Sequence, residues 1–449
     1  MSGVDPENDT GGAFLLSRRH FLHTAGLGSA GLLLAGEARL PAAPVSAAAA
    51  GAVQSLQFLV GFDAGAITSL KRVGDAFDTD YIASGRRLGD GVVRFRRANE
   101  GWQTLNTATL TERQIRSASE GRQHTAVYAP AGAALQIKVE FAVEDTAVNW
   151  QVALENLSGQ PLEIGDVAFP LFMNSNFREQ PTTAVLKHSF ISGDGSFLFW
   201  MRRNSVGPYL TMTPDPNTHL EYWESQGGGY HIFVHSAAAG AAARERGTHW
   251  RQPNTSVTLA PHGNASATRV YGFKLQWAAD YQGVREILVN EGLVDVHIVP
   301  GMTVPADLFA RFALRTRPGV EISGVTAEFP RETTLRSLGR SGNARIYEVR
   351  FRRLGENRLT VRFGRGRHMH LEFFSTEPVE TLIGKRAAFI ASKQHRDPAK
   401  WYNGLLAEWA LDTNVMLGPD NYDRIKGWRI YEVTCDDPGL SKPAFLAAK

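Results

Sequence analysis

Leu135-Gln136-Ile137-Lys138-Val139-Glu140-Phe141-Ala142-Val143 decides the fold, because a large apolar residue occupies every second position along it. The pattern returns from Val148 to Leu154, after a short polar break at Glu144-Asp145. A period of two in β-branched and aromatic residues is typical of a strand that buries one face. The two runs therefore predict a β-hairpin that contributes to a sheet with one buried side.

Similar runs continue along the chain and are separated by turn-forming clusters such as Gly193-Asp194-Gly195. They lie at Ser55 to Val60, Gly91 to Phe95, Gly195 to Met201, His231 to His235, Ser256 to Leu259 and Thr268 to Leu275. The best helical pattern in this region is short, from Gln282 to Asn290. Many strands and few helices predict a large sandwich of antiparallel sheets over residues 51–304.

A second β unit of different composition is predicted over residues 305–376. Apolar residues alternate with arginines from Tyr347 to Phe351 and from Leu359 to Phe363, on either side of a turn at Leu354 to Asn357. Such a pair of strands in about 70 residues favours a small immunoglobulin-like sandwich. Its many arginines could bind an acidic polysaccharide or simply solvate the outer strand faces, and their even spacing favours the second interpretation.

Helical periodicity begins only near the end of the chain, from Pro378 to Ser392, with the proline at a position that a helix start tolerates. Residues 377–449 are therefore expected to form a linker helix and the start of a helical domain.

Composition excludes several classes of protein. The 449 residues are 43% hydrophobic and 21% charged, with a net charge of +3, which argues against disorder and against nucleic-acid binding. Cys435 is the single cysteine, so no intrachain disulfide can form. No apolar run reaches the roughly 18 residues of a membrane span. The sequence also lacks zinc-type Cys/His spacing and a phosphate-binding glycine loop, so we expect no metal and no cofactor.

Residues 1–50 have the layout of an export signal. Ser17-Arg18-Arg19-His20-Phe21-Leu22 precedes a weakly apolar, glycine-containing stretch and then a tract of small residues from Pro41 to Ala50. The paired arginines resemble the twin-arginine signature. We therefore expect a secreted protein, periplasmic or extracellular, exported by the twin-arginine route.

Several segments resemble the domain-of-unknown-function 5695 family of secreted proteins. They are Glu163 to Asp166, Lys187 to Ile191 with Gly195 to Phe197, Trp401 to Trp409 and Cys435 to Lys442. The resemblance covers residues 55–449. It implies an architecture like that of six-hairpin glycosidases, with a galactose-mutarotase-like β-supersandwich followed by an α/α toroid. Because the chain stops at Lys449, where the toroid is expected to begin, it would be truncated and inactive unless that domain is supplied.

The expected function is that of the N-terminal portion of a carbohydrate-active enzyme that acts on poly- or oligosaccharide. A glycoside hydrolase, which needs two carboxylates, is favoured over a polysaccharide lyase. The candidate catalytic residues are Asp436, Asp437 and Glu408, in aromatic- and acid-rich segments typical of sugar sites. The candidate substrate-binding residues are Trp401, Tyr402, Trp409, Arg386 and His188.

Three alternatives remain open. A lyase would use a base and a cation drawn from Tyr402, His395 and Arg386. A non-catalytic carbohydrate-binding module would present an aromatic platform of Trp200, Tyr222 and Trp223. An aldose-epimerase-like sugar enzyme would pair His188 or His219 with Glu221. His219 and Glu221 lie two residues apart, as same-face neighbours on a strand would.

Overall fold

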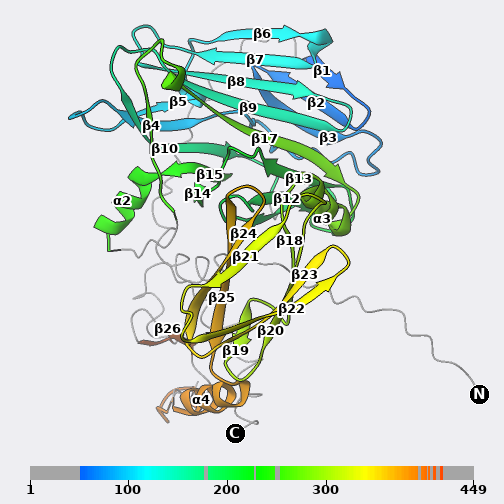
Figure 1. Cartoon of the computed structure of the whole chain (residues 1–449), viewed down its shortest axis with the longest axis vertical. Coiled ribbons are helices and arrows are strands. Elements are labelled where there is room, and N and C mark those ends of the chain that lie inside the picture. The colour runs from blue at the N-terminus through cyan, green and yellow to red at the C-terminus, as the bar shows by residue number, and fades with distance from the viewer. Residues whose placement is uncertain are drawn as a thin grey trace, which may run out of the picture.

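The computed structural model describes residues 51–175, 180–226, 229–247, 253–392, 396–401, 403–404, 408–410 and 415–417. Two β-structured bodies lie one above the other, and helix α4 (Val379–Ser392) lies at the far end of the second (Figure 1). The mainly β, antiparallel fold class predicted from the alternation is confirmed.

The first body is a sandwich of extended sheets. Its eight-stranded sheet runs in the order β11 (Val185–Phe190), β12 (Phe197–Arg202), β13 (Tyr209–Pro214), β17 (Thr268–Ala278), β9 (Ala147–Asn156), β8 (Leu135–Val143), β7 (Gln123–Tyr128) and β6 (Gln114–Ala118). The six-stranded sheet is β14 (Tyr222–Gln226), β15 (Gly229–Ser236), β10 (Leu162–Leu171), β4 (Val92–Arg96) and β5 (Gln103–Asn106), with β16 (Val257–Leu259) also on β10. A third sheet holds β1 (Gly51–Gln54), β2 (Phe58–Asp63) and β3 (Ala66–Arg72). All of the pairings in these three sheets are antiparallel.

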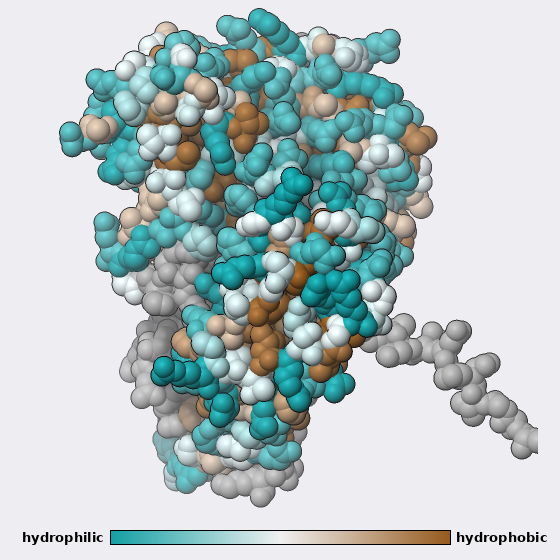
Figure 2. All heavy atoms as spheres, in the orientation of Figure 1, coloured by the Kyte–Doolittle hydropathy of each residue, from teal (hydrophilic) through white to brown (hydrophobic). Residues whose placement is uncertain are grey.

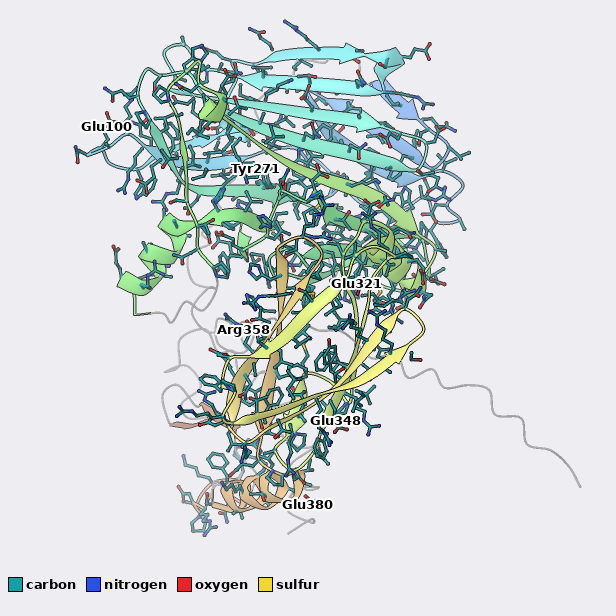
Figure 3. All side chains as sticks on the ribbon, in the orientation of Figure 1. Glu100, Tyr271, Glu321, Glu348, Arg358 and Glu380 are labelled. Atoms are coloured by element: carbon teal, nitrogen blue, oxygen red, sulfur yellow. The ribbon has the colours of Figure 1, made fainter. Side chains whose placement is uncertain are left out.

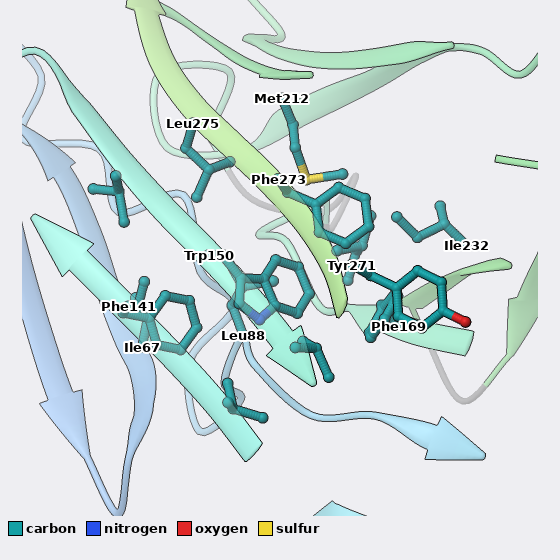
Figure 4. Close-up of a cluster of buried hydrophobic side chains, with 14 of the residues drawn as sticks. Ile67, Leu88, Phe141, Trp150, Phe169, Met212, Ile232, Tyr271, Phe273 and Leu275 are labelled. Carbon is teal, nitrogen blue, oxygen red and sulfur yellow. The ribbon is translucent and has the colours of Figure 1, made fainter. Parts of the chain in front are cut away.

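An aromatic cluster fills the space between the sheets. The strands β8 and β9 pair as the predicted hairpin, with Phe141 opposite Trp150, and both side chains are buried. The Trp150 ring centroid lies 5.0 Å from that of Phe273 in the same sheet and 5.3 Å from that of Phe169 in the six-stranded sheet (Figure 4). Phe169 makes edge contacts with both rings, and these contacts join the two large sheets. Tyr271 borders this cluster, and its hydroxyl points away from Trp150.

Short helices cover parts of the sheets. The predicted helix at Gln282 to Asn290 is confirmed as α3 (Tyr281–Asn290), which starts where the Asp280 carboxylate accepts a hydrogen bond from the Gly283 N–H at 2.8 Å. It packs on strands β13 and β17. The remaining helical elements here are α2 (Ala237–Glu245), η1 (Thr107–Thr109), η2 (Ser119–Gly121) and η3 (Ala265–Ala267).

The second body is a small sandwich of two four-stranded sheets. One sheet is β18 (Asp295–Val299), β20 (Ala310–Arg315), β23 (Ala344–Phe351) and β22 (Thr333–Ser341). The other is β19 (Thr303–Pro305), β25 (Arg367–Thr376), β24 (Gly355–Phe363) and β21 (Ile322–Ala327), in which β19 and β25 are parallel. The two sheets share one apolar core, in which Phe312, Phe351 and Phe373 are buried.

The arginines of this sandwich lie mostly on its surface, where hydrophilic side chains flank a band of hydrophobic ones (Figure 2). Many of them are paired with carboxylates. Arg311 and Arg336 both bind Glu348, Arg340 and Arg345 both bind Glu321, and Arg358 lies 3.2 Å from Glu372. Glu321, Glu348 and Arg358 are labelled in Figure 3. The pairing favours arginines that solvate the strand faces over a convergent site for an acidic polymer.

The two sandwiches are joined by hydrogen bonds to strand β25. The Asp194 carboxylate accepts from the His368 N–H at 2.7 Å, and the Ser192 hydroxyl donates to the His370 carbonyl at 2.9 Å. Gly195 approaches this strand so closely that a Cβ there would lie 2.7 Å from Cβ of Met369. The Gly193–Gly195 cluster, expected only as a turn, therefore also forms part of the contact between domains.

The predicted helix near the C-terminal end is confirmed as α4, and a two-stranded sheet of β26 (Glu408–Ala410) and β27 (Val415–Leu417) follows it. Among the described residues, no helix has the length and apolar character needed to cross a membrane.

Candidate functional site

The predicted catalytic cluster near the C-terminus is only partly described. Asp436, Asp437 and Tyr402 lie outside the described residues, as does His395. Glu408 and Trp409 belong to β26, opposite Leu417 and Met416. Trp401 is 79% exposed, and Arg386 is exposed on α4 with its guanidinium 5.6 Å from the Phe389 ring centroid. These predictions stay untested.

His188, the remaining predicted substrate-binding residue, lies within an aromatic stack on β11. Its ring stacks on Phe199 at 4.5 Å, and Phe199 in turn stacks on Tyr209 at 6.0 Å. Burial, followed by the neighbouring charge of Lys187, lowers the pKa of His188. The buried Nε2 atom has no hydrogen-bond partner, so the ring packs as a neutral aromatic group.

Lys187 points to the opposite face of β11, between the two large sheets. Its Nζ lies 3.6 Å from the ring centroids of both Trp223 and Tyr230 and forms no hydrogen bond. Burial lowers the pKa of Lys187 to about 7. An ammonium in this position has cation–π contacts but none of the hydrogen bonds that it makes in water.

Replacing Lys187 by methionine is expected to raise the free energy of unfolding by about 1–3 kcal/mol near pH 6, because it removes an unpaired polar atom and keeps the aromatic contacts. The folded-state pKa is below the ordinary lysine value, so the wild-type chain loses stability as the pH falls from about 10 to about 7. The advantage of methionine should therefore shrink near pH 10. Denaturant unfolding at both pH values measures it, and a Lys187→Met variant less stable than wild type near pH 6 would contradict the interpretation.

Two expectations about sugar sites are wrong. Trp200 is 1% exposed and lies in the core, so it cannot form a platform with Tyr222 and Trp223. His219 and Glu221 are not strand neighbours, since they precede β14 and only Leu220 between them forms an isolated bridge.

His231 and His235 lie four residues apart on β15, a spacing that puts two side chains on one face of a regular strand, but they point to opposite faces. The register with β10 passes from Phe233 to His235 and leaves Val234 as the extra residue of a β-bulge. His231 meets the Phe172 ring at 6.2 Å, whereas His235 meets the buried Tyr271 ring at 5.6 Å. The bulge thus turns His235 towards the end of strand β17.

His235 belongs to a polar cluster that we call the His235 site. Its members come from four separate segments and are His219, Glu221, His235, Thr255, Arg269 and Tyr271. Thr255 is exposed and Tyr271 is buried, so the site runs from the surface into the sandwich. Figure 3 shows Tyr271 inside the first sandwich.

Glu221 anchors the site. Its buried carboxylate accepts from the Thr255 N–H at 3.0 Å, from the Thr255 hydroxyl and from the Ser236 hydroxyl at 2.7 Å. Burial raises the pKa of Glu221 while these hydrogen bonds oppose the rise. With both oxygens engaged, Glu221 cannot serve as the free base that the epimerase alternative requires.

The same hydrogen bonds set the tautomer of His235. Its Nδ1 lies 2.7 Å from the Thr255 hydroxyl oxygen, whose single proton is donated to Glu221. Nδ1 must therefore carry the ring proton, and Nε2 keeps its lone pair. Nε2 has no hydrogen-bond partner. Burial, followed by the charge of Arg269, lowers the pKa of His235 to about 4, so this nitrogen is a neutral base at ordinary pH.

His219 has the opposite character. Its Nδ1 lies 2.6 Å from the Asp194 carboxylate, and this hydrogen bond raises the pKa of His219. Burial alone would raise the pKa of Asp194, but hydrogen bonds from His219 and the His368 N–H hold it below its ordinary value. The His219 side chain is 49% exposed, so it is accessible as a proton donor.

Arg269 and Tyr271 complete the site from alternate positions of β17. The Arg269 guanidinium carbon lies 5.9 Å from the Tyr271 ring centroid, and its Nη2 donates to the Asn217 carbonyl at 3.5 Å. The Tyr271 hydroxyl and the Arg269 Nε are buried and lack hydrogen-bond partners. Burial raises the pKa of Tyr271, which keeps the hydroxyl protonated.

Sequence reasoning missed Thr255, Arg269 and Tyr271. Arg269 occupies an inward position of the predicted strand Thr268 to Leu275, and the other inward positions of that strand carry aromatic or aliphatic residues. A charged residue at such a position is a sequence signal for a buried polar site. Within the described part of the chain, no group of three or more His, Cys, Asp and Glu residues is placed to hold a metal ion.

The sequence matches DUF5695, a family of unknown function, over residues 74–403. The chain belongs to the DUF5695 family. The match confirms the resemblance, although it ends within the Trp401 to Trp409 run and before the Cys435 to Lys442 run. No curated protein matches the sequence.

Solved structures of carbohydrate-active proteins match parts of this chain. A polysaccharide lyase matches with a TM-score of 0.62 at 15% identity, over 81% of this chain and 53% of its own. The DUF5695 chain thus spans about half the length of that lyase. An α-galactosidase from Geobacillus stearothermophilus matches at 11% identity over 54% of this chain and 42% of its own, with a TM-score of 0.31. A galactose mutarotase related enzyme from Lactobacillus acidophilus matches at 8% identity over 52% of this chain and 99% of its own, with a TM-score of 0.32.

Proposed function

We propose that this DUF5695 protein is an exported carbohydrate-active enzyme that cleaves a uronate-containing polysaccharide by β-elimination at the His235 site. One observation carries the proposal: of two histidines near Arg269, His235 packs on the buried Tyr271 ring at 5.6 Å, whereas His219 is half-exposed with Nδ1 2.6 Å from the Asp194 carboxylate. Burial accordingly lowers the pKa of His235, and the carboxylate raises the pKa of His219. Such a pair supplies a neutral base and a protonated acid at the same pH. The fold shared with a polysaccharide lyase supports this reaction class.

The chemistry assigns each group one role. The Nε2 atom of His235 is buried in this structure. Once substrate binding exposes it, it removes the proton on the sugar carbon next to the uronate carboxylate, which Arg269 neutralises. The electron pair of that C–H bond forms a carbon–carbon double bond as the bond to the glycosidic oxygen breaks. His219 then gives its proton to the departing oxygen. A hydrolase would instead need two available carboxylates. Of its candidates, Glu408 lies on β26, and Asp436 and Asp437 lie outside the described residues, so the hydrolase alternative stays a prediction.

The test follows the ultraviolet absorbance of the unsaturated uronate released from polygalacturonate, alginate and glycosaminoglycans. A His235→Gln variant is expected to lose about 100-fold or more of the elimination rate. His231→Gln, on the opposite face of the same strand, is the matched control and should retain the rate. The pH profile should fall below about pH 4 as His235 protonates, and it should fall on the alkaline side as His219, whose pKa is raised, deprotonates. His219→Gln should remove the alkaline fall.

Two outcomes would contradict the proposal. New reducing ends without the unsaturated chromophore would indicate hydrolysis. Absence of both turnover and binding with every polyuronate would exclude the His235 site as a uronate site.

A further inference from the structure

We propose a second saccharide-binding site on the outer face of the eight-stranded sheet, suited to a neutral sugar unit. It is a groove of about 300 Å³ across strands β8, β9 and β17. Its lining residues are Gln136, Lys138, Glu140, Gln151, Ala153, Glu155, Thr268 and Val270, which we call the β8–β17 groove.

The strand register explains why this face is hollow. Lys138, Ala153 and Val270 lie side by side in one row across the three strands. Ala153 is the smallest of them and lies between two longer side chains, so the middle of the row is low. In the next row Gly272 stands beside Gln151, and the Asp215 carboxylate fills the space over it, since a Cβ there would come within 1.9 Å of Oδ2. The hollow therefore lies over Ala153 and Val270, which form its apolar floor.

The rim of the groove is polar and fixed. The Gln136 amide donates to Glu155 at 3.0 Å, and Lys138 lies 2.8 Å from the Glu140 carboxylate. Gln151 is exposed on the same face. Amides and carboxylates offer both donors and acceptors to neighbouring hydroxyl groups of a sugar. Val270, which is 46% exposed, and Ala153 supply the apolar contact that the C–H face of a pyranose ring needs.

Charge decides the class of sugar. The groove holds one lysine and two glutamates, and the lysine is already paired with Glu140. A uronate carboxylate would meet the charge of Glu155, whose basic neighbour is the exposed His262, with Nδ1 3.6 Å from Oε1, and no lysine or arginine of the described residues is paired with it, so an uncharged sugar is favoured. The His235 site has the opposite preference because of Arg269. The two sites use opposite faces of β17, since Thr268 and Val270 face the groove while Arg269 and Tyr271 face inward.

Affinity electrophoresis of the full chain through gels that contain galactomannan, laminarin or xyloglucan tests the proposal. At least one of these neutral polysaccharides should retard the wild-type protein. Ala153→Phe, which fills the floor, is expected to weaken the retardation at least tenfold. Ala142→Phe is the matched control, because it makes the same exchange on the same face of β8 outside the groove, and it should behave as wild type.

Gln151→Ala provides a second variant if Ala153→Phe does not fold, since it only removes an exposed amide, and it should also weaken retardation. Unchanged retardation of a folded groove variant would overturn the proposal, as would a wild-type chain that none of the three neutral polysaccharides retards. Elimination activity on a short uronate oligosaccharide should be the same in Ala153→Phe and wild type, so the groove and the His235 site fail or succeed separately.

Discussion

Replacing Arg202 by methionine is expected to lower the free energy of unfolding by about 3–5 kcal/mol, the usual cost of breaking a buried ion pair from one side. Arg202 is fully buried on β12, and its Nη1 donates to the Asp75 carboxylate at 2.7 Å and to the Thr79 hydroxyl at 3.2 Å. Nη2 donates to the Gly207 carbonyl. The guanidinium thus ties the segment after β3 to the loop between β12 and β13.

The cost arises mainly from what the substitution leaves behind. The Asp75 side chain is 2% exposed, so its charge would remain in the interior without a counter-ion. Replacing both partners, with Arg202→Met and Asp75→Leu together, removes that uncompensated charge and should recover most of the loss. The pair therefore contributes less to stability than either single variant suggests.

Urea unfolding of both single variants, the double variant and wild type gives the coupling free energy. Arg116→Met, at an exposed position of β6, is the control and should change stability by less than about 0.5 kcal/mol. A loss below about 1.5 kcal/mol for Arg202→Met would mean that water reaches the pair. A double variant as unstable as the sum of the singles would mean that the pair is not coupled.

The strands and the helices α3 and α4 could be predicted because each depends on a local pattern. Alternation around Trp150 is enough to place that side chain in the core, and the short helical pattern from Gln282 follows a capping Asp280. Such features can be predicted from the spacing of side chains in a helix or strand and from the identity of residues close in the sequence.

The His235 site could not be predicted in the same way, because its geometry depends on a bulge and on contacts between distant segments. A strand without the bulge at Val234 would put His231 and His235 on one face. Glu221 meets Thr255 across 34 residues, and Asp194 meets His219 across 25. The spacing to Glu221 identified His219 as a candidate from the sequence, whereas the opposite pKa displacements of His219 and His235 follow from neighbours that only the fold brings together.

Asp295→Ala is expected to lower the free energy of unfolding by about 3 kcal/mol and to separate the unfolding of the two sandwiches. The Asp295 side chain is 3% exposed at the start of β18. Its carboxylate accepts from Nε and Nη2 of Arg285, both at 2.9 Å, and from Nε of Arg315 at 2.9 Å. Arg285 lies on α3, which packs on the first sandwich, and Arg315 lies on β20 of the second.

Removal of this carboxylate leaves two guanidinium groups facing each other at the junction. The Arg285 and Arg315 side chains are 24% and 27% exposed, so solvent screens part of the repulsion between them. The expected loss of unfolding free energy is therefore at the lower end of the range for breaking a buried ion pair from one side. The hydrogen bonds to β25 at Asp194 and Ser192 would still hold the domains together. The junction should therefore loosen while each sandwich keeps its own core.

The distribution of tryptophans makes this measurable. Residues 294–376 contain no tryptophan, whereas Trp150 and Trp277 lie in the first sandwich. Tryptophan fluorescence therefore follows mainly the first sandwich, and far-ultraviolet circular dichroism follows both. The two unfolding curves should coincide in wild type and separate in Asp295→Ala. Glu286→Ala, which removes only the exposed second partner of Arg315, is the control and should cost less than about 1 kcal/mol. Coincident curves in Asp295→Ala would show that the contacts to β25, and not this carboxylate, couple the two domains.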